Sequence, residues 1–212
     1  MFVLGLTGSI GMGKSATAAM FRARGIPVHD ADAAVHALYR GSAAPLIERV
    51  FPGTIAADGT VDRAKLGERV LGRPDALREL ERIVHPLVRA EEEEFLARAR
   101  AARAALVVLD IPLLLEVGAG GRCDAVLVVS APAPIQRSRV LARSGMTEAK
   151  FLAILEKQIP DADKRRAAHF IVDTGLGFAR AEATVSGIVR ALAGRPGRAR
   201  RPGPEMHPDP AA

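Results

Sequence analysis

The sequence has very few cysteines and aromatic residues. Of its 212 residues, one is a cysteine, Cys123, none is a tryptophan and 4% are aromatic. A lone cysteine excludes an intramolecular disulfide and favours a reducing compartment, so we expect a cytoplasmic protein in which Cys123 is a small buried hydrophobe or an inert thiol. So few aromatic side chains argue against the stacking platforms that bind single-stranded nucleic acid.

Long apolar stretches are also absent. The longest, such as 106–109 and 125–129, fall far below the roughly 20 residues that a membrane helix needs. The first five residues, Met-Phe-Val-Leu-Gly, have neither the basic region nor the cleavage site of a secretory signal. We therefore expect no membrane partner.

Positive charge is in modest excess. Thirty lysines and arginines against 24 aspartates and glutamates give a net charge of +6. The basic residues are scattered along the chain, which suits a protein that handles polyanionic small molecules, and we expect no nucleic-acid partner. The last segment, 194–212, is rich in proline, glycine and arginine and predicts a disordered tail.

Short apolar runs, each a predicted strand, alternate with helical patterns. They lie at 2–7, 26–29, 106–109, 125–129 and 170–172. Strands that alternate with helices are typical of parallel crossover units. The chain is therefore predicted to be an α/β protein with a three-layer, doubly wound parallel sheet of about five strands and a last helix over 179–193.

The stretch from about 31 to 103 is too long for a simple crossover and has no convincing strand. Asp62 is expected to cap one helix, Pro74 to open another, and Pro86 to begin a third. This pattern predicts a helical insertion beside the sheet.

A second long stretch, about 136–167, predicts two or three helices with breaks near Gly145 and Pro160. We expect it to form a lid. The expected organisation is a single domain with a core at 1–30, 104–135 and 168–193, the insertion at 31–103 and the lid at 136–167.

Residues 8–15 match the phosphate-binding motif G-x-x-x-x-G-K-[ST], between a predicted strand and a predicted helix. The glycines let successive backbone N–H groups surround phosphate oxygens at the positive end of the helix. Lys14 is expected to bridge the β- and γ-phosphates, and the Ser15 hydroxyl to hold Mg²⁺. The chain is thus predicted to bind a nucleoside triphosphate through this P-loop, which comprises Gly8, Ser9, Ile10, Gly11, Met12, Gly13, Lys14 and Ser15.

Acidic residues follow the predicted second and third strands, at the sheet edge where ligands bind. Asp32 is expected to accept a proton from an attacking hydroxyl, whereas Asp30 is either a second such group or the N-cap of the next helix. Asp110 is either a Walker-B acid that reaches Mg²⁺, directly or through water, or a residue of a strand-end turn. Glu116 is either a site residue or a solvated helix residue.

The lid carries two arginines, Arg139 and Arg143, spaced to share one face of a predicted helix. Guanidinium groups in a mobile segment can close over phosphates and neutralise the charge of the transition state. Lys164 is either a further such group or structural. By itself, His85 before a proline is interpreted as a local cap or a packed residue, one turn from Arg89.

In this order, the motifs resemble the dephospho-CoA kinase family over about residues 1–193. The resemblance rests on the P-loop with the preceding Leu6-Thr7, and on 28–32, 84–89, 110–116, 139–143, 158–160 and 168–175. It implies a P-loop kinase fold and the transfer of phosphate from ATP, with Mg²⁺, to the ribose 3′-hydroxyl of dephospho-CoA. The implied partners are ATP and dephospho-CoA, and we expect a monomer or a weak homo-oligomer.

The resemblance also implies roles for single residues. It implies catalytic roles for Asp32, Lys14, Arg139 and Arg143. The implied substrate-binding residues are Thr7, Asp32, His85, Arg89, Leu113 and Glu116, with the insertion as the CoA-binding domain. For ATP, it adds Ala16, Asp173 and Gly175 to the P-loop.

The chain departs from the family at a few positions. Thr174 stands where the family usually has Asn, Ser144 where it has Asp, Ala16 where it has Thr, and Leu115 where Phe is common. A nucleoside monophosphate kinase, another small-molecule kinase, or a P-loop switch or nucleic-acid-coupled ATPase stays open as an alternative. The Asp-x-Asp after the second strand and the His-Pro insertion favour dephospho-CoA as the acceptor.

Overall fold

A five-stranded parallel sheet forms the centre of the computed structural model, which describes residues 1–197. Along the sheet the strands are β2 (Val28–Asp30), β3 (Leu106–Asp110), β1 (Phe2–Thr7), β4 (Ala125–Ser130) and β5 (Phe170–Asp173). Every neighbouring pair is parallel, which confirms the predicted α/β class. The second strand begins at Val28 rather than at 26, just after Pro27, which has no N–H to add to a ladder.

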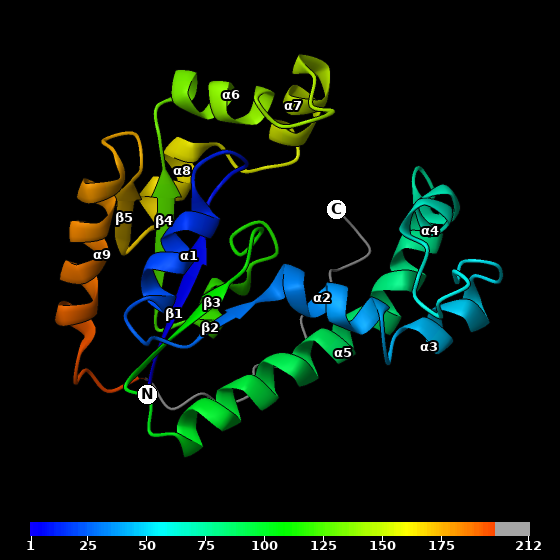
Figure 1. The fold of residues 1–212 in the computed structure, drawn as a ribbon, viewed down its shortest axis with the longest axis horizontal. Coiled ribbons are helices and arrows are strands. Elements are labelled where there is room, and N and C mark those ends of the chain that lie inside the picture. The colour runs from blue at the N-terminus through cyan, green and yellow to red at the C-terminus, as the bar shows by residue number, and fades with distance from the viewer. Residues whose placement is uncertain (198–212) are drawn as a thin grey trace.

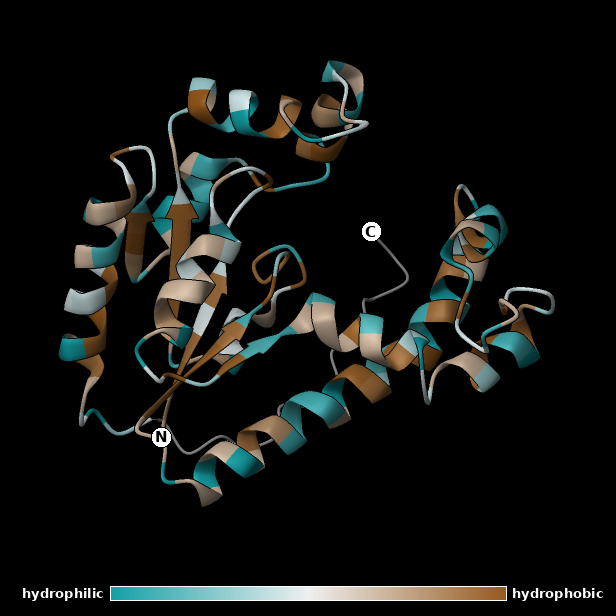
Figure 2. Ribbon diagram, viewed as in Figure 1, coloured by the Kyte–Doolittle hydropathy of each residue, from teal (hydrophilic) through white to brown (hydrophobic). Residues whose placement is uncertain are grey.

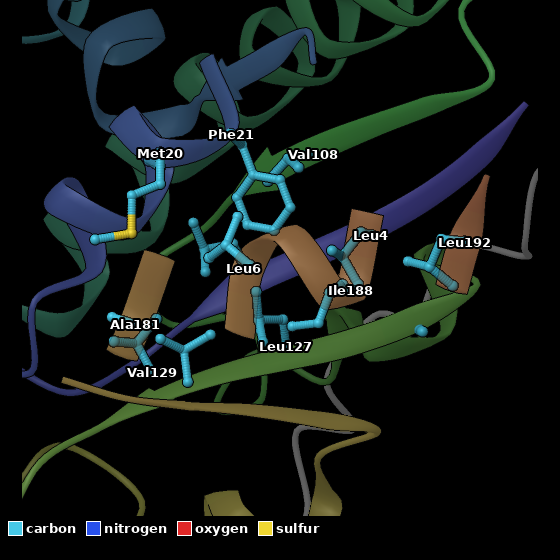
Figure 3. Packing of buried hydrophobic residues seen from close by; sticks show 14 of the residues in the cluster. Leu4, Leu6, Met20, Phe21, Val108, Leu127, Val129, Ala181, Ile188 and Leu192 are labelled. Atoms are coloured by element: carbon cyan, nitrogen blue, oxygen red, sulfur yellow. The ribbon is translucent and has the colours of Figure 1, made fainter. Parts of the chain in front are cut away.

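Helices cover both faces of the sheet, so the core has three layers (Figure 1). On one face, α1 (Lys14–Arg22) and α9 (Phe178–Leu192) pack on Leu4, Leu6 and Leu127, as Figure 3 shows. On the other face, the end of α5 (Pro74–Ala101) packs against the alternate strand residues Val3 and Val107. Burial on both faces explains why the strands are apolar without alternation.

The predicted helical insertion is present and has its own apolar core (Figure 1). Besides α5, it contains α2 (Ala31–Tyr39), α3 (Ala44–Val50) and α4 (Arg63–Val70). Asp62 caps α4 as expected, because its carboxylate accepts bonds from the Ala64 and Lys65 N–H groups. The insertion joins the sheet through α5, which spans both parts.

The prediction that Pro86 begins a separate helix is wrong, because α5 is one continuous helix of 28 residues. Pro86 lies in its interior with an exposed ring, where it removes one hydrogen bond to the carbonyl four residues earlier. The buried face nevertheless runs on from Leu80 and Val84 to Leu96 and Ala99. Figure 2 shows the resulting bands of brown and teal around this helix. Burial of that face offsets the lost bond.

The stretch after β4 forms α6 (Ala133–Leu141), α7 (Glu148–Leu155) and α8 (Asp161–Ala167). The breaks fall near Gly145, which has a left-handed φ of 72°, and at Pro160, as predicted. Helices α6 and α7 lie beyond the carboxyl ends of the strands (Figure 1). A short 3₁₀ helix, η1 (Ala119–Arg122), precedes β4.

The final helix, α9, begins and ends one residue earlier than predicted. Residues 194–197 of the predicted tail are described, and Gly197 lies so close to the Met1 carbonyl oxygen that an added Cβ would stand 2.0 Å from it. The rest of the predicted disordered tail, 198–212, lies outside the described residues. Across 1–197, no helix is both long enough and apolar enough to cross a membrane.

Candidate active site

The P-loop turns from β1 into α1 through two glycines with left-handed backbones. Gly11 has φ 77° and Gly13, the residue that precedes α1, has φ 94°; side chains other than glycine's adopt these angles at a cost. An added Cβ on Gly11 would also lie 2.5 Å from Val140 of α6. The turn therefore leaves the first N–H groups of α1 without helical acceptors, as a phosphate site requires.

Lys14 and Asp110 meet at the carboxyl edge of the sheet. Lys14 Nζ lies 2.6 Å from Asp110 Oδ1, and the aspartate side chain is 2% exposed. Burial raises the pKa of Asp110, while the bond and charge of Lys14 act in the opposite direction. Asp110 is the register partner of Leu6 on β1 and of Asp30 on β2, so it stands between the P-loop strand and the second strand.

Asp30 is the N-cap of α2, which is one of the two roles left open by the sequence. Its Oδ1 accepts a bond of 3.0 Å from the Ala33 N–H, and its Oδ2 lies 3.7 Å from Arg22 Nη2. Asp32 lies in the first turn of the same helix and is exposed. Its carboxylate is therefore open to an incoming molecule, whereas that of Asp30 is engaged.

The loop after β3 connects several predicted site residues. The buried Thr7 hydroxyl donates to the Pro112 carbonyl at 2.9 Å, and the Leu113 side chain beyond it is 41% exposed. Glu116 Oε1 lies 2.6 Å from the Nζ of Lys164, whose side chain is fully buried. Because the Glu116 side chain is 12% exposed and ion-paired, its interpretation as a solvated helix residue is wrong.

The two lid arginines differ in their surroundings. Arg139 donates from Nη1 to the Thr174 hydroxyl at 2.7 Å and from Nη2 to the Thr174 carbonyl at 2.9 Å. That hydroxyl in turn donates to the Met12 carbonyl of the P-loop at 2.7 Å. Arg143 is exposed, and its side chain forms no hydrogen bond or ion pair within residues 1–197.

The expectation that both arginines lie on one helix is wrong. α6 ends at Leu141, two residues before Arg143. The Arg143 N–H bonds to Val140 in a tight turn, and the left-handed Gly145 follows, so the helical path ends there. Arg143 therefore belongs to the connection between α6 and α7.

The turn after β5 lies close to the P-loop. Asp173 Oδ1 accepts a bond of 2.8 Å from the Gly175 N–H, and an added Cβ on Gly175 would lie 2.4 Å from Pro132. Thr174 joins this turn to Met12, as described above. Within the P-loop, Ser9 is buried, whereas Ser15 and Ala16 in the first turn of α1 are exposed.

His85 and Arg89 lie four residues apart on exposed positions of α5. Neither side chain makes a hydrogen bond or ion pair with the rest of the described chain. The structure therefore does not join them to the P-loop by any direct contact.

Sequence reasoning gave no role to Gln136 and Gln158, which contact the P-loop, although the segment 158–160 was among those that carry the resemblance. Gln136 Nε2 donates to the Ile10 carbonyl at 2.7 Å, and Gln158 Oε1 accepts from the Ile10 N–H at 3.1 Å. No local pattern could have found these contacts, because Ile10 lies more than 120 residues away from both glutamines in the sequence.

A metal ion would find few protein ligands here. Within residues 1–197, no group of three or more His, Cys, Asp or Glu side chains is arranged to hold one. The oxygen donors near the P-loop are the exposed Ser15 hydroxyl and the Asp110 carboxylate. This small set fits Mg²⁺, which keeps several waters and takes one or two protein ligands together with substrate phosphates.

Comparison with known proteins gives consistent matches. A family model described as dephospho-CoA kinase matches residues 2–178. The dephospho-CoA kinase of Mesorhizobium japonicum is 62% identical over 93% of this chain and 100% of its own length. That of Brucella melitensis is 54% identical over 95% of this chain and 100% of its own length.

Solved structures agree on the fold. The crystal structure of TT1252 from Thermus thermophilus has a TM-score of 0.80 at 37% identity, covering 90% of this chain and 96% of that one. The dephospho-CoA kinase of Campylobacter jejuni has a TM-score of 0.63 at 23% identity, covering 90% and 97%. At that identity, the second match supports the fold alone.

Proposed function

The chain belongs to the dephospho-CoA kinase family, whose reaction transfers a phosphoryl group from ATP to the ribose 3′-hydroxyl of dephospho-CoA, and we propose that the site at the carboxyl edge of its sheet performs that transfer. The products are CoA and ADP. The observation that carries the proposal is the P-loop whose Lys14 meets Asp110 one strand away from the Asp30–Asp32 segment.

On the donor side, the P-loop amides and Lys14 bind the triphosphate. The Lys14 ammonium has three donor hydrogens, so it can keep its bond to Asp110 and donate to a phosphate oxygen as well. In-line transfer needs little covalent participation by protein, and positioning and charge stabilisation supply most of the rate. Ala16, Asp173 and Gly175 complete the ATP site in this proposal.

On the acceptor side, Asp32 orients and deprotonates the 3′-hydroxyl. Its exposed carboxylate follows β2, and Asp30 holds the helix that carries it. A carboxylate in hydrogen-bond reach of the attacking hydroxyl is the general base that this reaction needs. We also assign Thr7, Leu113 and Glu116 to substrate binding on this side, with Thr7 acting through its bond to the loop that carries the other two.

The lid and the insertion bind the rest of the substrates. Arg139 and Arg143 neutralise the charge of the transferring group, with Arg143 on the connection that can move over it. His85 and Arg89 bind dephospho-CoA from α5, so the insertion (31–103) is the acceptor domain beside the core and the lid (136–167).

Mg²⁺ is the metal that fits these residues, with Ser15 and Asp110 as its protein ligands, Asp110 directly or through water. When bound, it neutralises negative charge on the phosphates. We further propose that the protein is cytoplasmic, because a single cysteine suits a reducing compartment, and that it is a monomer or a weak homo-oligomer.

A panel of acceptors tests the proposed function. ADP release is measured with ATP, Mg²⁺ and, in separate wells, dephospho-CoA, AMP, UMP or shikimate. The proposal predicts turnover with dephospho-CoA well above that with the others. Preference for AMP or UMP, or ATP hydrolysis that polynucleotide stimulates without any small acceptor, would contradict it.

A further inference from the structure

Both glutamines of this chain hydrogen bond to the backbone of the same P-loop residue, Ile10, on the two peptide units that flank it. Gln136 donates to the Ile10 carbonyl and Gln158 accepts from the Ile10 N–H, at 2.7 and 3.1 Å. Ile10 lies between β1 and α1, so its N–H and its carbonyl form no hydrogen bond of the sheet or of that helix. Because unpaired backbone groups are costly in a protein interior, the two side chains stabilise this conformation of the loop.

The glutamines reach the loop from the start of the lid and from its connection between α7 and α8. Gln136 lies in the second turn of α6, is 5% exposed, and its backbone carbonyl would be 2.9 Å from a Cβ added to Gly11. Gln158 lies between α7 and α8, after the connection that carries Arg143. The part of the lid that carries Arg143 and α7 is thus fixed to Ile10 on both of its sides.

The stretch of chain that carries Gln158 also contacts the loop after β3. The N–H of the next residue, Ile159, donates to Glu116 Oε1 at 3.2 Å, and Glu116 pairs with the buried Lys164. Gln158 therefore contacts the P-loop, on the donor side of the proposed site, and Ile159 contacts Glu116, on its acceptor side.

We propose that Gln136 and Gln158 are positioning residues that clamp the backbone of Ile10 from two separate parts of the lid and hold the P-loop in its phosphate-binding shape. This inference rests on the proposed function for its kinetic consequences, although the clamp itself is a property of the ligand-free protein. Neither glutamine touches a reacting atom, and each acts through the loop.

Amide hydrogen exchange at Ile10 in the ligand-free protein tests the clamp directly. Gln158→Met keeps the side-chain length but removes the strong acceptor, and exchange at Ile10 should become about three- to tenfold faster, as loss of one net hydrogen bond implies. Gln158→Glu keeps an acceptor, and Glu156→Gln alters a nearby exposed side chain. Both should leave exchange at Ile10 close to that of the wild-type protein.

Gln136→Met provides a second variant should Gln158→Met fail to fold. It frees the Ile10 carbonyl, in the peptide unit that follows the Ile10 N–H, and so loosens the same residue, and exchange at Ile10 should rise here too. Unchanged exchange in the folded Gln158→Met protein, or in Gln136→Met if that protein alone folds, would overturn the proposal.

Kinetics give an independent readout. Each methionine variant should lower kcat about three- to tenfold with a smaller change in KM for ATP, because the loop acts on the terminal phosphate in the transition state. The double variant should lose little more than the worse single one, since either loss releases the backbone of Ile10. Multiplicative losses would mean two unrelated contacts and overturn the clamp. Absence of turnover with dephospho-CoA in the wild-type protein would refute the proposed function and leave the exchange result intact.

Discussion

Lys14 Nζ and Asp110 Oδ1 lie 2.6 Å apart at the carboxyl edge of the sheet. The lysine comes from the P-loop and the aspartate from the end of the adjacent strand, so the contact joins the triphosphate site to the strand that separates it from Asp30 and Asp32. The geometry places one positive and one negative group where a phosphoryl group and its metal are expected.

Replacing Lys14 by methionine should lower kcat by roughly 10²–10³, because a preorganised donor to the developing charge is lost. ATP affinity should also fall, since the ammonium binds the phosphates in the ground state too. The measurements are initial rates with dephospho-CoA and calorimetric titration of ATP. Lys157→Met, on an exposed lid lysine, is the control, and a Lys14→Met enzyme within threefold of this control would contradict the assignment.

Asp110→Asn should remove a loss of stability that the wild-type protein undergoes as pH rises. Burial raises the pKa of Asp110 in the folded protein, so the folded state binds its proton more tightly than the unfolded chain does. Its contribution to stability is then fully present below the ordinary aspartate pKa and is lost as pH rises through the raised value. Asparagine does not ionise and avoids this loss.

The free energies of unfolding of the wild-type protein and Asp110→Asn, measured in urea, should therefore diverge as pH rises from about 4 to 7. The difference between the two free energies of unfolding should change in favour of the variant as the pH rises. A difference that stays constant, or that moves in favour of the wild-type protein, would show that ionisation of the buried Asp110 carboxyl does not lower the stability of the folded protein.

Arg143→Ala should reduce kcat by roughly 10² while weakening dephospho-CoA binding much less, because in the proposed mechanism the lid closes after both substrates have bound. Arg139→Ala should reduce kcat and also lower the melting temperature, because Arg139 is bonded to Thr174 in the ligand-free protein. Steady-state kinetics, equilibrium binding and thermal melting separate these effects. Equal melting temperatures for wild type and Arg139→Ala would mean that those two bonds do not stabilise the fold.

Pro86→Ala should stabilise the protein by about 1–2 kcal/mol, because alanine restores the missing helix hydrogen bond at an exposed position, in part offset by a less restricted unfolded chain. Pro74→Ala is the matched control, since Pro74 is at the first turn of α5, where no N–H is needed. Urea midpoints at unchanged slope measure both. A destabilised Pro86→Ala protein would contradict this explanation of the unbroken helix.

The sequence predicted well those features that depend on local patterns. The apolar runs indicated all five strands, and the P-loop followed from its spacing and its strand–helix context. Long-range pairing was beyond such patterns. Nothing local places β3 between β1 and β2, although this order brings Asp110 to Lys14.

Side-chain partners far apart in sequence were also unpredictable. Glu116 is separated by about 50 residues from Lys164, and only the packing of α8 on the sheet buries their ion pair. Pro86 was misread because a proline is a local signal for a helix start, whereas the two apolar surfaces that α5 bridges are a tertiary property. The roles of Gln136 and Gln158 depend on the lid folding back onto Ile10.

The central claim is that Asp32 activates the acceptor hydroxyl beside a triphosphate held by the P-loop. The most direct measurement is kcat of Asp32→Asn at saturating ATP and dephospho-CoA, compared with Asp30→Asn, in which asparagine still caps α2. We predict that Asp32→Asn loses roughly 10²–10⁴ in kcat with nearly unchanged ATP affinity, as expected for a lost general base, while Asp30→Asn stays close to wild type. Near-normal turnover by Asp32→Asn would contradict the claim.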